Sequence, residues 1–96
     1  MKFVWDEQKA TINIQKHNVS FEEAKTVFDD IEALLLFDPD HSETEERFIL
    51  LGMSLSLRIL IVCHCYRNND NVIRIISARK ATKNEANTYF RRKENA

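Results

Sequence analysis

Four of the arginines that lie in or beside the apolar runs of this chain are the first sign of chemistry. They are Arg47, Arg58, Arg74 and Arg79. A guanidinium group binds phosphate oxygens through two parallel hydrogen bonds, so arginines that share a surface can hold an anion. The alternative is that each arginine extends from a sheet into water or pairs with an acidic side chain.

Arg79 is the strongest single candidate. It ends a predicted strand directly before a predicted helix, with Ser77 and Lys80 beside it. Strand ends next to helix N-termini bring backbone donors and cationic side chains together around an anion. Alternation places Arg74 and Arg79 on opposite faces of their strand, so they form one clamp only if the strand breaks near Ser77.

Lys16 and His17 are the candidates for proton transfer. Histidine exchanges protons near neutral pH, as general acid–base catalysis requires. Both side chains also lie at the predicted end of a helix, where the helix dipole favours cations, and this alone could explain them. Near the C-terminus, Tyr89 could stack on a nucleic-acid base, although an exposed tyrosine is common on a terminal helix.

Metal and nucleotide-cofactor chemistry find little support in the sequence. Cys63 and Cys65 alternate along an apolar run with His64 between them, so the two thiols share one face of a strand and the imidazole points to the other. We predict reduced, packed thiols rather than a zinc site or a disulfide. With a single glycine, the chain cannot form a glycine-rich phosphate loop. We therefore predict neither metal nor cofactor.

A net charge of −1 conceals a polarised sequence. Residues 1–46 carry four basic and twelve acidic side chains, whereas residues 47–96 carry ten basic and three acidic ones. A polyanion could therefore bind one region and a basic partner another. The 96 residues predict one domain spanning the whole chain, and the lack of a long apolar segment predicts a soluble cytoplasmic protein that does not enter a membrane.

The elements that must position these side chains can be read from apolar periodicity and capping residues. Strands are predicted at 2–5, 33–37, 47–53, 58–66 and 72–78, and helices at 7–17, 21–30 and 83–93. The first helix has its apolar face at Ala10 and Ile14, and the last at Ala86 and Phe90. Short connections between the later strands favour antiparallel hairpins.

The order of several short motifs resembles the BrnT toxin family. The motifs are residues 3–6 (Phe-Val-Trp-Asp), 16–24 (Lys-His-Asn-Val-Ser-Phe-Glu-Glu-Ala), 28–30 (Phe-Asp-Asp), 46–48 (Glu-Arg-Phe), 51–52 (Leu-Gly) and 74–82 (Arg-Ile-Ile-Ser-Ala-Arg-Lys-Ala-Thr). The resemblance runs from Phe3 to about Tyr89. Asn18 departs from it, because the family usually has Gly there, but Asn is the residue that best replaces Gly in a left-handed helix cap.

The resemblance implies an α+β fold of the RelE-like type, in which a small antiparallel sheet packs with two N-terminal helices and one C-terminal helix (β-α-α-β-β-β-α). It implies a metal-independent endoribonuclease toxin of a type II toxin–antitoxin pair that inhibits translation. It also implies a BrnA-type antitoxin whose ribbon-helix-helix module binds operator DNA, so the toxin meets DNA only through its partner. The alternative is a non-catalytic partner-binding module, or an operon corepressor, with the same fold.

The resemblance further implies roles for the candidate residues. A ribose 2′-hydroxyl would attack the neighbouring phosphate, and Arg79 would stabilise the charge that develops, helped by Arg74 or Arg47 if the fold brings them close. Lys16 or His17 would move the protons. The side chains left to bind RNA would be Arg47, Arg58, Lys80 and Tyr89.

Overall fold

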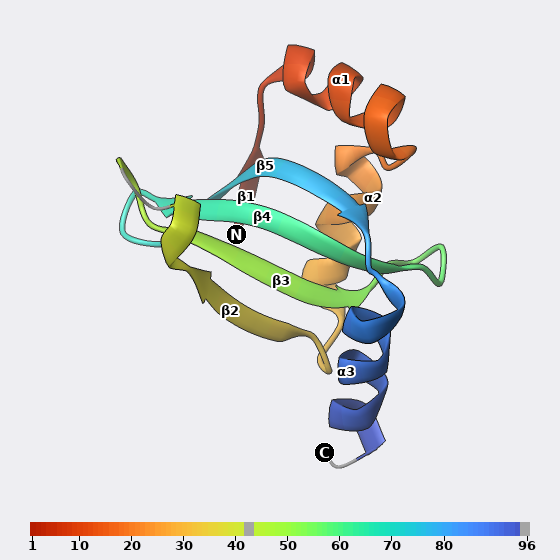
Figure 1. The fold of residues 1–96 in the computed structure, drawn as a ribbon. Helices are drawn as coiled ribbons and strands as arrows, with labels where there is room; N and C mark the ends of the chain where they lie inside the picture. Colours follow the sequence, from red (N-terminus) through yellow and green to blue (C-terminus); the bar gives the residue numbers. More distant parts are fainter. Residues whose placement is uncertain (42–43, 95–96) are drawn as a thin grey trace.

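In the computed structural model, which describes residues 1–41 and 44–94, five strands form one sheet (Figure 1). The strands are β1 (Lys2–Val4), β2 (Leu34–Asp38), β3 (Arg47–Met53), β4 (Ile59–Arg67) and β5 (Val72–Lys80). The helices are α1 (Glu7–His17), α2 (Phe21–Thr26) and α3 (Lys83–Glu94), with short 3-10 turns η1 (Val27–Asp29) and η2 (Pro39–His41). The predicted α+β class is confirmed. Within the described residues, no helix has the length and apolar character needed to cross a membrane.

The strands lie in the order β1-β5-β4-β3-β2. The sheet differs in two details from the one that the family resemblance implies. Four strands follow the N-terminal helices, as the apolar runs predict, rather than three. The sheet is also mixed, because β1 pairs with β5 in parallel, whereas the other neighbours are antiparallel. The antiparallel neighbours follow one another directly in the chain, but β1 is separated from β5 by the whole of the rest of the sheet.

One face of the sheet packs against α1 and α2 and contains the main core (Figure 1). Phe21 and Val27 are fully buried there against residues of β4 and β5. The predicted helix at 21–30 is shorter than expected, since α2 ends at Thr26 and the chain tightens into η1. The Thr26 hydroxyl donates to the Glu23 carbonyl, a bond that competes with the helical ladder.

The buried face of α1 consists of Ala10 and Asn13, so the prediction that Ile14 belongs to it is wrong. Asn13 Nδ2 donates to the carbonyls of Val19 (2.9 Å) and Ala78 (2.8 Å), and its Oδ1 accepts from the Ala78 N–H (3.1 Å). Ile14 is instead 47% exposed. A polar residue thus fixes the end of α1 to β5.

The opposite face of the sheet is covered only in part, by α3. Tyr89 is 1% exposed against Leu51 and Ile61, and its hydroxyl donates to Asp30 Oδ2 at 2.7 Å. Burial, together with the Asp30 carboxylate, raises the pKa of Tyr89 to about 12. The predicted apolar pair of α3 is wrong in part, because Phe90 remains exposed and Tyr89 is the residue that packs. The part of this face beyond α3 stays open.

Candidate functional site

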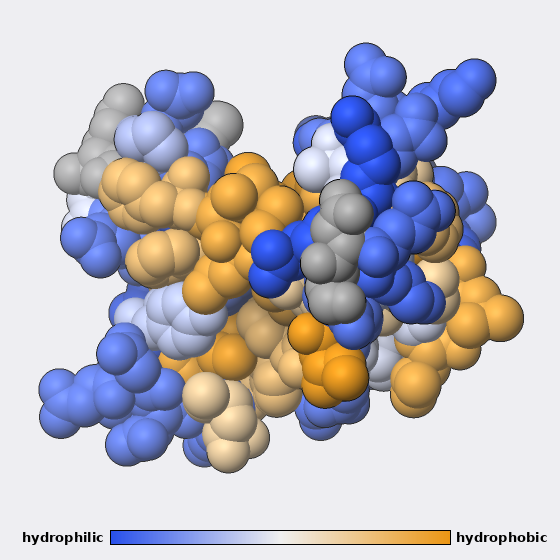
Figure 2. Space-filling model, turned by 90° about the horizontal axis from the view of Figure 1, so that it is seen from below, coloured by the Kyte–Doolittle hydropathy of each residue, from blue (hydrophilic) through white to orange (hydrophobic). Residues whose placement is uncertain are grey.

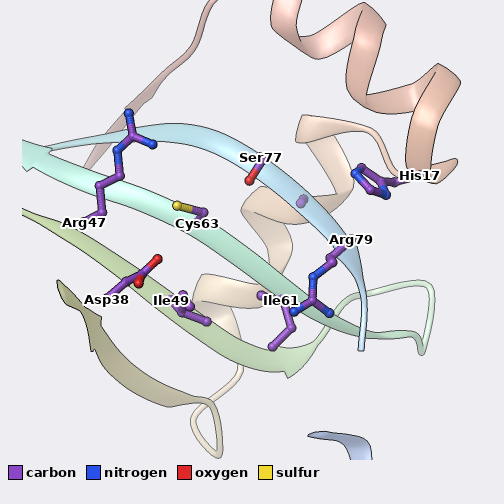
Figure 3. A pocket seen from close by; sticks show the side chains of 9 residues that line it. His17, Asp38, Arg47, Ile49, Ile61, Cys63, Ser77 and Arg79 are labelled. Atoms are coloured by element: carbon purple, nitrogen blue, oxygen red, sulfur yellow. The ribbon is translucent and has the colours of Figure 1, made fainter. Parts of the chain in front are cut away.

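The open part of the sheet face contains a cavity of about 320 Å³ (Figure 3). Side chains from β2, β3, β4 and β5 and from the end of α1 line it. The polar and charged ones are His17, Asp38, Arg47, Cys63, Ser77 and Arg79, and the others are Ile49, Ile61 and Ala78. The fold thus brings together three predicted site residues that lie far apart in the sequence, namely Arg47, Arg79 and His17.

An irregularity in β5 decides which arginines share this face. Cys63 pairs with Ser77 but His64 pairs with Ile75, so Ile76 is an extra residue. Such a bulge reverses the alternation that follows it. The predicted opposite orientation of Arg74 and Arg79 is therefore wrong.

The sheet register gives the face of each arginine. Arg74 pairs with Cys65, and Arg79 pairs with Ile61. Those two partners lie four residues apart on β4, hence on the same face. Only Arg79 lines the cavity, whereas Arg74 lies farther along the sheet, outside it.

Arg79 has a fixed guanidinium group at one end of the cavity. Its Nη1 donates to Glu85 Oε1 (2.8 Å) and its Nη2 to Glu85 Oε2 (3.0 Å). Nη1 also donates to the Lys80 carbonyl at 3.3 Å. The two bonds with Glu85 raise the pKa of Arg79 and, through Arg79 itself, lower that of Glu85 to about 2, so both groups stay charged.

Arg47 lies at the other end of the cavity, as Figure 3 shows. Arg47 pairs with Asp38 across the β2–β3 ladder. The Nη2 atom of Arg47 is 3.9 Å from Glu45 Oε1. Each arginine of the cavity therefore has a carboxylate neighbour within the protein. Asp38 was not among the predicted site residues, because only the strand register reveals that it faces Arg47.

Cys63 and Ser77 occupy the middle of the cavity, paired across β4 and β5. Burial raises the pKa of the Cys63 thiol, although the positive charge of Arg47 and a hydrogen bond from Ser77 oppose this effect. The thiol is therefore protonated at neutral pH and is a poor nucleophile. Both cysteines are free, as predicted, but Cys63 lines the site rather than the core.

His17 reaches the cavity from the last turn of α1 (Figure 3). Asn13, one helical turn earlier, holds this end of α1 against Ala78, the residue between Ser77 and Arg79. Lys16 lines a neighbouring cavity of about 160 Å³ that shares His17 and Ser77 with the first. The predicted proton-transfer pair thus lies at the rim of the arginine site.

Three predicted RNA-binding residues lie elsewhere. Arg58, directly before β4, donates from Nε to Glu23 Oε2 (2.9 Å) and from Nη2 to the Asn18 carbonyl (3.0 Å) and to Glu23 Oε1. These bonds connect the start of β4 to α2. Lys80 pairs with Leu60, whose side chain is in the helix-covered core, so it points away from the cavity. Tyr89, a residue of α3, is buried between that helix and the sheet. These three side chains therefore do not lie on the open part of the sheet face.

His64 is fully buried on the helix-covered face, with its ring 4.9 Å from that of Phe28. Burial lowers its pKa, so the imidazole is neutral at neutral pH. Across residues 1–41 and 44–94, no group of three or more His, Cys, Asp or Glu side chains is arranged to hold a metal ion.

Two comparisons with known proteins indicate the family and the fold of this chain. The family described as ribonuclease toxin BrnT of type II toxin–antitoxin systems matches residues 5–85. The chain is also similar to the solved structure of the Brucella abortus ribonuclease toxin BrnT, with a TM-score of 0.65 and 26% sequence identity, over 86% of this chain and 99% of that one. A comparison with curated proteins found no match to this chain.

Proposed function

Because the chain belongs to the BrnT family of ribonuclease toxins of type II toxin–antitoxin systems, we propose that it cleaves RNA in the cavity between Arg47 and Arg79, without a metal ion. The observation that carries this proposal is the convergence of two arginines and a histidine on one open cavity. The proposal places the chain in the cytoplasm, where cleavage of its RNA substrate would inhibit translation.

The proposed step is attack of a ribose 2′-hydroxyl on the adjacent phosphorus. The bond to the 5′-oxygen of the next nucleotide breaks, leaving a cyclic phosphate and a free 5′-hydroxyl. Negative charge builds on the phosphate oxygens in the transition state, and fixed guanidinium groups stabilise it. Arg79 and Arg47 fill this role from the two ends of the cavity.

Proton transfer in this proposal belongs to His17, with Lys16 beside it. An imidazole can accept the proton of the 2′-hydroxyl or donate one to the leaving 5′-oxygen. Among the described residues that line the cavity, His17 is the only histidine. The Cys63 thiol takes no part in the step, since its raised pKa keeps it protonated.

Purified chain, free of any antitoxin, should cleave RNA in the presence of excess EDTA. The positive charge that stabilises the transition state comes from arginines, so removal of divalent ions should change the rate by less than about twofold. Cleavage of a labelled RNA on a denaturing gel measures this. Activity that vanishes in EDTA and returns with added Mg²⁺ would contradict metal independence. Intact RNA at every protein concentration would instead indicate a non-catalytic binding module.

We assign the BrnA-type antitoxin to the edge of the sheet at β2. Leu35, Leu36 and Phe37 are 49%, 45% and 51% exposed, and β2 has a strand neighbour on one side only in the described part of the chain. Figure 2, which views the molecule from below, shows hydrophobic residues gathered beside the polar C-terminal helix. Edge strands are normally protected by lysine, proline or a bulge, and none of these lies within β2.

Charge favours a different protein over a second copy of this chain at that edge. Glu32 precedes β2 and Asp38 ends it, so two copies paired along β2 would bring acidic residues together. A partner with apolar and basic side chains fits better. The ribbon-helix-helix module of such an antitoxin would carry the pair to operator DNA.

Expression of the chain alone should arrest bacterial growth, and co-expression with the neighbouring reading frame should restore it. The physical reason is that the antitoxin covers the toxin and prevents access of RNA. Growth curves at equal toxin levels, verified by immunoblot, measure the effect. Normal growth at confirmed soluble expression of the toxin alone would count against toxicity.

A further inference from the structure

We infer that Glu85 is a positioning residue, which orients the Arg79 guanidinium so that its Nε–Nη2 edge can bind two oxygens of one phosphate. That the phosphate belongs to RNA rests on the proposed function. The orientation itself rests on the hydrogen bonds of Arg79, Glu85 and Thr82.

The donors of Arg79 divide into two groups. A guanidinium has five N–H bonds, and its two terminal nitrogens form one fork while Nε and Nη2 form a second. Glu85 occupies the first fork at 2.8 and 3.0 Å, and the Lys80 carbonyl accepts the other Nη1 hydrogen. Among the described residues, no hydrogen-bond partner occupies the second fork, formed by the Nε–H and the remaining Nη2–H.

The free edge has the geometry that a phosphate requires. Two parallel N–H bonds match two phosphate oxygens, and this bidentate pairing is the stronger form of a charge-assisted hydrogen bond. Arg79 lines the cavity together with Ile61, and Figure 3 shows the Arg79 guanidinium beside that side chain. An arginine held by a carboxylate along one edge therefore presents its other edge at a fixed place.

Glu85 can hold Arg79 because Glu85 is itself held. Its Oε1 also accepts from the Thr82 N–H at 2.8 Å, while its own N–H donates to Thr82 Oγ1 at 3.2 Å. This reciprocal pair is a capping box that fixes the start of α3. Tyr89, one turn further along α3, secures the helix to Asp30. The carboxylate is thus part of the helix terminus rather than a free surface group.

The carboxylate has two opposite effects on anion binding. It lowers the net charge next to the phosphate, which weakens ground-state attraction. It also removes the rotation of the guanidinium, and misplacement of a catalytic group by about 1 Å can cost as much as 100-fold in rate. If positioning is the role of Glu85, its removal should lower kcat and leave KM unchanged or smaller.

Glu85→Gln tests the inference, with Glu22→Gln as the matched control. Gln keeps the side-chain length but removes the negative charge, so it cannot accept both guanidinium bonds as a carboxylate does. Glu22 is exposed in the first turn of α2 and does not line the cavity, so the same substitution there removes an equal charge without affecting Arg79. We expect kcat for RNA cleavage to fall about 10-fold in Glu85→Gln, with KM no higher than in the wild type, and to stay within about twofold in Glu22→Gln. Wild-type kcat in Glu85→Gln, or equal losses in both variants, would overturn the inference.

A second measurement does not depend on catalysis. In ¹⁵N-labelled protein, the Arg79 Nε–H resonance should shift saturably on titration with inorganic phosphate. The resonance should broaden in Glu85→Gln and remain sharp in Glu22→Gln. A phosphate shift without RNA cleavage would leave the positioning role intact and contradict the proposed ribonuclease function. The positioning role would be contradicted if the Nε–H resonance did not shift with phosphate. It would also be contradicted if the line width of this resonance were the same in Glu85→Gln as in the wild type.

Discussion

Arg79→Ala is expected to lower the rate of RNA cleavage by at least about 100-fold, the cost typical of removing one donor that stabilises charge in a transition state. The side chain lines the cavity and carries the free donor edge. Arg79→Lys should recover only a small part of this loss, because an ammonium group retains the charge but cannot form two parallel hydrogen bonds. Single-turnover cleavage at saturating enzyme separates this chemical effect from RNA binding.

The stability of Arg79→Ala should change little. Its ion pair with Glu85 is partly exposed, with 41% of the arginine side chain accessible, and such pairs contribute about 0–1 kcal/mol. Arg74→Ala is the matched control, since Arg74 lies on the same strand and face but outside the cavity. We expect its cleavage rate to stay within about threefold of wild type. Equal losses in the two variants would indicate general attraction of RNA to a basic surface rather than a site at Arg79.

Apart from the end of α2, the helix ends of this fold could be predicted from the sequence because capping is local. Asp6 accepts from Gln8 and Lys9, and Asn18 adopts the left-handed conformation with φ 55° at the end of α1. Thr82 and Glu85, three residues apart, form the capping box at the start of α3. Each of these depends on residues a few positions apart. The same locality explains why the apolar runs predict the strands.

The face on which each arginine lies could not be predicted, since it depends on pairing between distant residues. Alternation is a reliable guide only while the ladder is regular, and the extra residue Ile76 reverses it between Arg74 and Arg79. Nothing in the local sequence marks a bulge there, because Ile75 and Ile76 are themselves good strand formers. Asp38 could not be predicted as a site residue for a related reason, because only the register of β2 against β3 places it opposite Arg47.

The roles of Glu85 and Tyr89 were also hidden by an adequate local explanation. The spacing of Thr82 and Glu85 already accounts for the glutamate as a helix cap, so its second partner, Arg79, is not required by the pattern. Tyr89 looks exposed on a polar helix until Asp30 and Leu51 are known to lie beneath it. When a residue has both a local and a distant partner, its sequence context indicates only the interaction with the local one.

Asn13→Ala should lower the free energy of unfolding by about 2–4 kcal/mol, the range expected when a buried hydrogen-bond network is broken. Ala78 pairs with Val62 of β4, but the N–H and carbonyl of Ala78 are both bonded to the Asn13 amide, together with the Val19 carbonyl. Truncation to alanine leaves these backbone groups buried and unpaired. Chemical denaturation with urea, followed by circular dichroism, measures the loss.

Gln15→Ala is the control for Asn13→Ala, because Gln15 is exposed on the same helix and its loss should change stability by no more than about 0.5 kcal/mol. Stability equal to wild type in Asn13→Ala would show that water replaces the amide without cost. The more informative result concerns activity. At a temperature where the variant is fully folded, a remaining loss of cleavage would show that the Asn13 anchor also keeps His17 at the cavity, so one buried amide would link the stability of β5 to the proton-transfer site.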